Sequence, residues 1–207
     1  MLMWRHLQSR TRTRLLAIRR RAANQDGIAA VEFAMLLPVM ITLFFGVVET
    51  SLALLCRADV SIMASTAADL ISQADTVATA DIGNVYSAAS TILYPYYDGT
   101  NTKPTIRLTS VIWDTVGKSA TVGKVAWTCT QSGSGTLSPA SRTVNGNVTL
   151  PQALLTAGNS VIVAEIAYNY VSPTTQVITG PINFTNNFYT KPRRVPQIPT
   201  PTGGCPT

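Results

Sequence analysis

The chain has 207 residues and a mass of 22.1 kDa, which is room for one ordinary domain and an appendage. Charged residues make up only 13%, about half of the usual ~25%, and this argues against a highly solvated, disordered chain. The whole net charge of +6 lies in residues 1–27, where seven arginines face one acid, so the rest of the chain lacks the basic surface expected of a nucleic-acid-binding protein.

A long apolar segment follows this basic leader. The residues from Phe33 to Val48 are all uncharged and lie between Glu32 and Glu49. A helix over 28–55 would be about 42 Å long, enough to cross a hydrocarbon core of about 30 Å. We therefore predict a membrane-spanning helix. Because the arginines precede it, the positive-inside rule places the leader in the cytoplasm and the remainder of the chain outside.

Other kinds of N-terminal segment share parts of this pattern. A secretory signal peptide needs a small-x-small cleavage site, which Ser51-Leu52-Ala53 matches weakly. A lipoprotein site at Cys56 is excluded because Leu55 before it is not small. A transit peptide fits the arginine-rich start but does not explain an acid inside the apolar run. A secretory signal and a plain membrane anchor remain as alternatives.

Glu32 lies inside the apolar run, where an ionised side chain is costly. In one interpretation it is a residue near the membrane edge whose carboxylate reaches water. In the other, cleavage after Gly27 frees a positive amino group at Ile28. That amine then pairs with a carboxylate on the same or a neighbouring helix, so that a charge pair forms in an apolar helical bundle.

The N-terminal third resembles the TadE-like minor pilins, or pseudopilins, of the tight-adherence branch of type IV pilus systems. Such proteins show a Gly, a small or apolar residue after it, a Glu at the fifth position, an apolar helix and a second Glu near its outer end. The resemblance covers residues 22–70 strongly and 155–195 more weakly, through Val161–Tyr170 and Lys191-Pro192-Arg193. The residues that carry its strong part are the arginine leader, Asp26–Phe33 and Phe45–Glu49.

The resemblance implies a function and a set of site residues. A prepilin-type peptidase would cut between Gly27 and Ile28, and Glu32, Phe33 and Glu49 would serve assembly with other pilins and the assembly platform. The protein would sit in the bacterial inner membrane as a single-pass protein, and from there enter or help to start an adhesive pilus. The alternative is an uncleaved single-span envelope protein whose outer domain binds a partner.

The helical pattern continues beyond the membrane segment. Apolar residues at helical spacing predict one helix over 28–78, and Thr79-Ala-Asp81 marks the start of a second helix over 79–94. The alanine-rich stripe of the first helix is interpreted as ordinary core, or as a surface for a pilin sheet or a partner helix. The stripe residues used for this prediction are Val60, Met63, Ala67, Leu70, Ala74 and Val77.

Residues 95–207 change to a strand pattern and end in a proline-rich tail. Four runs are predicted as strands, near 106–113, 122–127, 162–170 and 182–188. Residues 130–150 are expected to form a surface loop, and Pro151–Leu155 a short helix. No long crossover separates the strands, which favours an antiparallel sheet. The expected fold class is therefore α+β and pilin-like, with a long spanning helix, a second short helix and a small antiparallel β-sheet domain.

Three cysteines suit an oxidising compartment. Cys129 and Cys205 both fall in the outer domain, whereas Cys56 lies at the membrane-proximal part of the helix. We predict a Cys129–Cys205 disulfide that ties the tail to the sheet. Cys56 is then left unpaired.

The sequence offers few candidates for catalytic or ligand-binding chemistry. The single histidine, His6, lies in the leader, so a processed chain would lack every histidine-based catalytic or zinc site. Gly117-Lys118-Ser119 lacks the earlier glycine of a phosphate-binding loop and reads as a turn. Asp114 and Glu165 have no spacing that implies acid–base work. We expect no enzyme activity, cofactor, metal, small-molecule substrate or nucleic-acid partner.

Overall fold

A computed structural model describes residues 26–97, 99, 102–113, 121–151 and 154–205. The arginine leader with His6, as well as Asp114 and Gly117-Lys118-Ser119, lies outside these residues. The chain divides into two compact units, residues 1–48 and residues 49–207. One helix, α2 (Asp26–Ser72), begins in the first unit and ends in the second.

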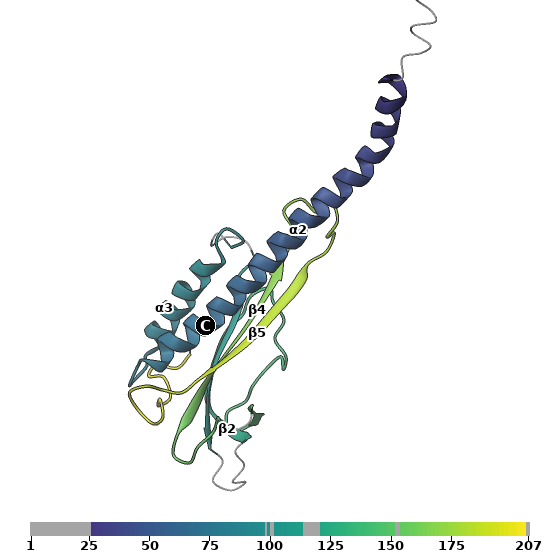
Figure 1. The fold of residues 1–207 in the computed structure, drawn as a ribbon. Coiled ribbons are helices and arrows are strands. Elements are labelled where there is room, and N and C mark those ends of the chain that lie inside the picture. Colours follow the sequence, from purple (N-terminus) through teal and green to yellow (C-terminus); the bar gives the residue numbers. More distant parts are fainter. Residues whose placement is uncertain (1–25, 98, 100–101, 114–120, 152–153, 206–207) are drawn as a thin grey trace, which may run out of the picture. The chain divides into compact units, whose positions relative to one another are not determined.

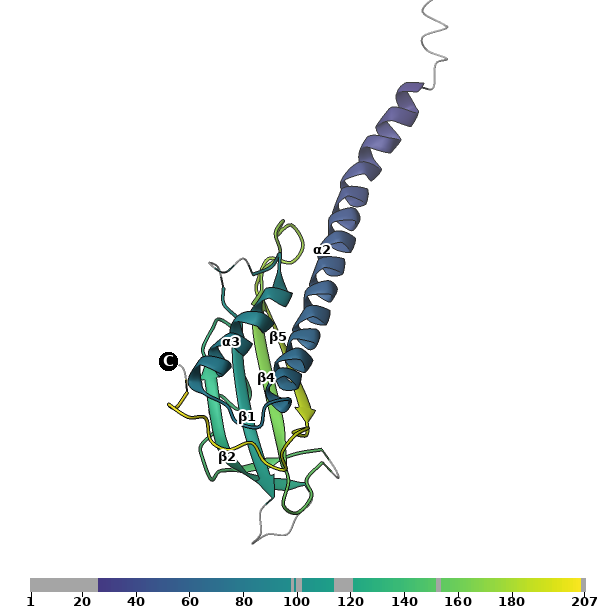
Figure 2. The same cartoon turned by 90° about the vertical axis from the view of Figure 1, so that its left-hand side faces the viewer.

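The second unit contains a five-stranded sheet with two helical segments on one face (Figures 1 and 2). After α2 come α3 (Thr79–Ser90) and a short 3₁₀ helix (Thr91–Leu93). The sheet order is β3-β2-β1-β4-β5 and every neighbouring pair is antiparallel. The predicted α+β class is confirmed. The strands are β1 (Thr105–Trp113), β2 (Val122–Gln131), β3 (Asn147–Thr149), β4 (Ser160–Tyr170) and β5 (Ile182–Thr190).

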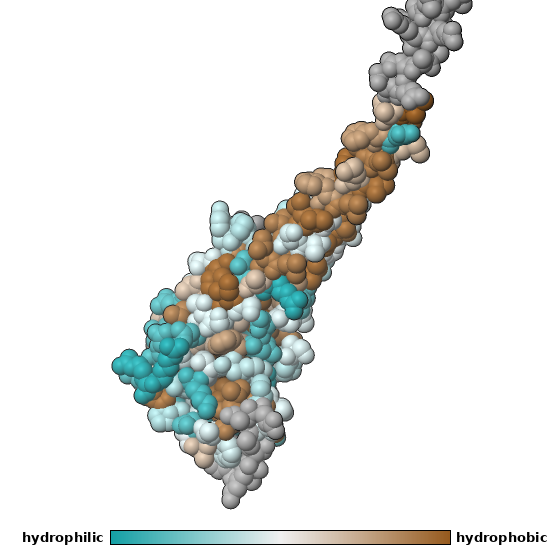
Figure 3. Space-filling model, viewed as in Figure 1, coloured by the Kyte–Doolittle hydropathy of each residue, from teal (hydrophilic) through white to brown (hydrophobic). Residues whose placement is uncertain are grey.

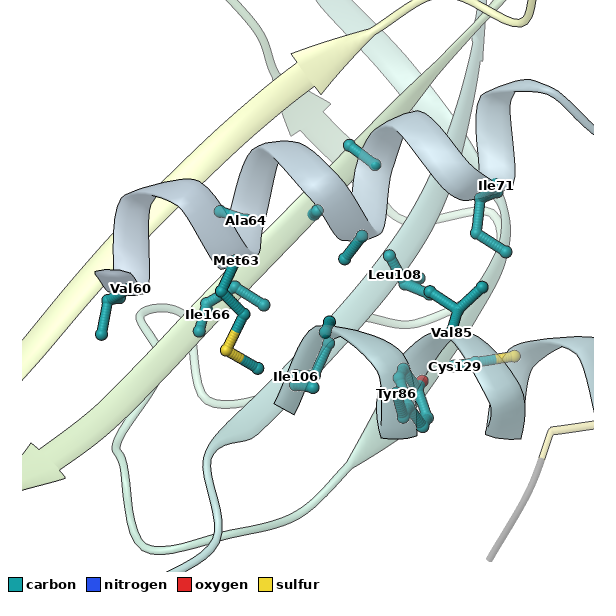
Figure 4. Packing of buried hydrophobic residues seen from close by; sticks show 14 of the residues in the cluster. Val60, Met63, Ala64, Ile71, Val85, Tyr86, Ile106, Leu108, Cys129 and Ile166 are labelled. Atoms are coloured by element: carbon teal, nitrogen blue, oxygen red, sulfur yellow. The ribbon is translucent and has the colours of Figure 1, made fainter. Parts of the chain in front are cut away.

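The main core lies between the helices and the sheet (Figure 4). From Ala53 to Ile71, α2 buries small and medium apolar side chains three or four residues apart, which places them on one helix face. Alternate residues of the strands, such as Ile106 and Leu108 of β1 and Ile166 of β4, meet them. Alanines let the helix approach the sheet closely. The alanine-rich stripe therefore packs on the chain's own sheet, as ordinary core.

The opposite face of the sheet has a smaller core of its own. Because successive strand residues point to opposite faces, the odd-numbered positions of β4 lie here. Segments that follow β2 and β3 in the chain contribute Val148, Leu150 and Leu155 to this cluster. β4 is consequently buried along almost its whole length. The cluster consists of Val111, Val125, Val148, Leu150, Leu155, Val161 and Val163.

The C-terminal tail is tied back to the folded unit at several points. The Trp127 indole donates to the Ile198 carbonyl at 3.0 Å, and the Ile198 side chain is buried. Thr202 pairs with the residue before α3 in an isolated bridge. The structure joins Cys129 to Cys205 by a disulfide, with 5.2 Å between their Cα atoms, while Cys56 is free and buried.

Three sequence-based expectations differ from the structure. The helix expected over 28–78 ends earlier, at Ser72, where the Arg193 amide donates to the Ser72 carbonyl. Leu70, expected on the buried stripe, points outward with 39% of its surface exposed. The loop predicted over 130–150 contains the short edge strand β3. The described residues of 151–158 form no helix, because Leu155 packs into the second core instead.

Candidate functional site

The first turns of α2 carry the residues expected at a cleavage and assembly site. Gly27, Ile28, Glu32 and Phe33 are all exposed on this helix. Ile28 and Glu32 are four residues apart, so they lie one above the other on the same helix face. The structure thus places the bond proposed for cleavage one helical turn from the only acidic side chain within the apolar run.

The helix surface that follows exposes many apolar side chains, and the face seen in Figure 3 is mostly apolar. By length and composition α2 is able to cross a membrane, and none of its most apolar window is buried inside the protein. A water-soluble protein rarely exposes so large a continuous apolar surface. The exposed large apolar residues here are Ile28, Val31, Phe33, Met35, Leu36, Leu37, Val39, Met40, Ile41, Leu43, Phe44 and Val47.

Glu49 follows this apolar stretch directly and is fully buried in the second unit. Its carboxylate is held by the connection between β4 and β5. The Thr174 hydroxyl and the Gln176 amide donate to Oε1, the latter at 2.7 Å. The amides of Val177 and Ile178 donate to Oε2 at 3.1 and 2.6 Å. We call this arrangement the Glu49 nest, since consecutive backbone N–H groups form a concave anion site.

The model of the family described as TadE-like protein matches residues 27–69. This part of the chain is a TadE-like segment. It includes both Glu32 and Glu49 and ends within the buried stripe of α2. The likeness expected from the sequence is therefore confirmed over these residues, and it implies a protein associated with a Tad pilus, as a structural or assembly component. Comparisons with curated proteins and with solved structures find no match.

The TadE-like segment places its two glutamates in different surroundings. Glu32 is exposed, whereas Glu49 lies about 25 Å further along the helix and is enclosed by its own chain. Hydrogen bonding from Thr174 is the largest cause of a pKa lowered to about 2 for Glu49, and the three backbone amides add to it against the opposing effect of burial. Glu49 is thus held as an anion.

The nest also stabilises an unfavourable backbone conformation. Thr175 has a φ of 49°, in the left-handed region that β-branched residues rarely adopt. Its neighbours on both sides, Thr174 and Gln176, donate to the same oxygen of Glu49. Glu49 therefore fixes the turn that its donors come from.

We expect Glu49→Gln to loosen this turn, because an amide NH₂ group cannot accept hydrogen bonds from N–H donors. The amides of Gln176, Val177 and Ile178 should exchange with solvent faster, by about tenfold. The folded-state pKa of about 2 lies below the ordinary 4.5, so the stability that Glu49 contributes is present above about pH 4.5 and is lost as the pH falls toward 2. Hydrogen exchange across this pH range should show that dependence in the wild type and not in Glu49→Gln.

A buried ion cluster lies on the second face of the sheet and was not found from the sequence. Arg107 of β1 and Glu165 of β4 are register partners, and Arg107 Nε donates to Glu165 Oε2 at 2.6 Å. Arg142 donates to both carboxylate oxygens of Glu165, and Arg107 also donates to the Pro139 carbonyl at 2.8 Å. Burial alone would raise the pKa of Glu165, but the hydrogen bonds from Arg142 and Arg107 outweigh it and lower that pKa.

The cluster serves packing, because it fastens the segment after β2 over the sheet. Every oxygen of Glu165 is engaged by an arginine, so no carboxylate is left poised to exchange a proton with a ligand. Among the described residues, no group of three or more His, Cys, Asp or Glu side chains is placed to hold a metal ion.

Proposed function

We propose that the chain is a minor pilin or pseudopilin that is processed between Gly27 and Ile28 and takes part in assembly or initiation of an adhesive tight-adherence pilus. The observation that supports this most is one continuous helix, α2. It begins with the Gly27–Phe33 pattern and exposes an apolar surface, and its residues from Ala53 onward pack on the sheet of the second unit. The TadE-like match covers this helix.

The proposed orientation has the leader in the cytoplasm and the folded unit in the periplasm. The seven arginines before the span favour it, since positive residues stay on the cytoplasmic side. The Cys129–Cys205 disulfide favours it too, because such bonds persist in oxidising compartments. The partners in this proposal are the inner membrane, a prepilin-type peptidase, other pilins and the assembly platform.

Intact mass of the purified protein tests the processing step. Mature protein should begin at Ile28, and Gly27→Asp should retain the leader completely, because a charged side chain then replaces the glycine that the peptidase must accept. The side chain is not expected to disturb the fold, since nothing lies within 4 Å of a Cβ at Gly27.

Gly83→Asp is the matched control, because a Cβ at this glycine of α3 also meets nothing within 4 Å. It should be processed like the wild type. A Gly27→Asp product that starts at Ile28, or a wild-type protein that keeps Met1, would contradict the proposal. The second result would favour the uncleaved envelope protein whose outer domain binds a partner.

A further inference from the structure

The end of the membrane span can be located along α2 from its length. From Ile28 to Val48 the helix rises about 32 Å, close to the thickness of a hydrocarbon core. Glu49 is the next residue and the first acid after Glu32. A span that begins at Ile28 would therefore place the Glu49 carboxylate at the boundary between the hydrocarbon core and the lipid headgroups.

The connection between β4 and β5 is held at that same level by the Glu49 nest. Its amides lie 2.6–3.1 Å from the Glu49 carboxylate. Residues 171–181 contain no charged side chain, and neither does the whole run between Glu165 and Lys191. A loop without charges loses little hydration energy when it enters the headgroup region.

Several apolar side chains at this level are exposed. In the loop, Val171 is 54% and Val177 is 46% exposed, and on the next turns of α2, Leu54 and Leu55 are 59% and 58% exposed. We call these four residues the membrane-proximal collar. Leu54 and Leu55 lie about 8 Å beyond Glu49, within the depth of a headgroup layer.

The polar groups around the collar also suit an interface with lipid. Arg57 is the first charged residue after Glu49 along the helix and is exposed, about 12 Å beyond it, where lipid phosphates are found. Beside the loop lies an open hollow of about 550 Å³ lined mostly by apolar and aromatic side chains, among them Leu52, Tyr96 and Val171. Tyrosines are enriched at this depth of membrane proteins.

We propose that the membrane-proximal collar lies among the lipid headgroups, so that the 171–181 loop is a second membrane contact beside the spanning helix, with Glu49 as the residue that positions it. Glu49, which holds the loop, directly follows the apolar residues 28–48 in the chain. The proposed contact requires that α2 spans a membrane, and it does not require processing or entry into a pilus.

The test uses the full chain in phospholipid vesicles, with an environment-sensitive fluorophore on a single introduced cysteine. Cys56 is buried and Cys129 and Cys205 are bonded, so labelling is directed to the new site. Lipids that carry a nitroxide on the headgroup serve as the quencher. They should quench a fluorophore on Val177→Cys about threefold more than a fluorophore on Val144→Cys. Val171→Cys, at the other end of the loop, provides a second reading should one variant fold poorly.

Val144 is the matched control because it is an equally exposed valine, at 57%, far from the loop. The amide of its neighbour Asn145 donates to the Val125 carbonyl in β2. Val125 pairs with Val111 of β1, which in turn pairs with Val161 of β4. Val161 lies about 30 Å along β4 from Tyr170. Leu43→Cys, within the span, calibrates insertion through quenching by an acyl-chain nitroxide.

Equal quenching at Val177 and Val144 by the headgroup nitroxide would overturn the proposal. So would a lack of quenching of Leu43→Cys by the acyl-chain nitroxide. Shielding of Val177 that appears only when a second copy or another pilin is added would make the loop a protein interface and overturn the lipid contact. Adding Glu49→Gln to Val177→Cys should reduce the quenching while leaving Leu43 unaffected, which separates positioning of the loop from insertion of the helix. None of these readings depends on cleavage after Gly27.

Discussion

Glu165→Gln should lower the free energy of unfolding by about 3–5 kcal/mol, the cost of leaving a buried charge without its partner. Arg107 is the residue left behind, with 1% of its side chain exposed, and it points to the sheet face that is covered by the segment after β2. Arg142 is less affected, because its side chain is nearer to solvent. Denaturant titration of the full chain in detergent, followed by tryptophan fluorescence, measures the loss.

Two variants give this prediction its controls. Asp69→Asn neutralises the exposed Asp69–Arg193 pair by the same chemical change and should cost less than about 1 kcal/mol. The double variant Arg107→Met with Glu165→Leu removes both buried charges and should recover most of the stability. If Glu165→Gln costs no more than Asp69→Asn, then the buried cluster does not fasten the segment after β2.

The sequence predicts those elements whose hydrophobic pattern repeats several times. The apolar run and its helical continuation gave α2, and alternation gave β1, β2, β4 and β5, because each pattern reflects which side chains a regular element can bury. β3 has only three residues, too few for a pattern. The described residues of the helix expected over Pro151–Leu155 are not helical, because packing of Leu155 in the second core outweighs a local preference.

The parts of the candidate site whose residues are close together in the sequence could be predicted. The parts that depend on contacts between residues far apart in the chain could not. Gly27, Ile28, Glu32 and Phe33 stand close together in the sequence and form one exposed helix segment. The donors to Glu49 come from residues 125–129 positions later in the chain, and the Arg107–Glu165 pair depends on strand register. Neither long-range pairing leaves a signal in the spacing of one sequence. Glu49, for which the resemblance implies a role in assembly, is bound by donors of its own chain in the structure.

Glu32→Ala should abolish assembly while leaving membrane insertion and processing intact. Insertion depends on the summed hydrophobicity of Phe33–Val48, and removal of a carboxylate makes that sum more favourable. The proposed processing would depend on Gly27 and Ile28, which the substitution leaves unchanged. The variant should therefore have the mature mass, sediment with membranes and be missing from sheared filaments.

The proposed physical reason is charge pairing in an apolar bundle. In the proposed assembly the Ile28 amine and the Glu32 carboxylate are both removed from water, and either one alone would be an uncompensated charge. A cost of about 3 kcal/mol corresponds to about a hundredfold weaker association of subunits. Phe33 lies next to Glu32 and is itself exposed, so Phe33→Ala should weaken association through lost apolar contact without changing its dependence on pH.

Glu32→Gln separates charge from hydrogen bonding at this position. If the ion pair drives assembly, the neutral amide should fail as completely as alanine, because it leaves the Ile28 ammonium without a counter-charge. If a hydrogen bond to that amine is enough, the amide oxygen accepts it and filaments should form at nearly the wild-type level. Normal filament yield and normal recovery with other pilins for both Glu32→Ala and Glu32→Gln would refute both mechanisms. Glu32 would then be an interfacial residue whose carboxylate reaches water at the membrane edge, and assembly would rest on the apolar helix surface alone.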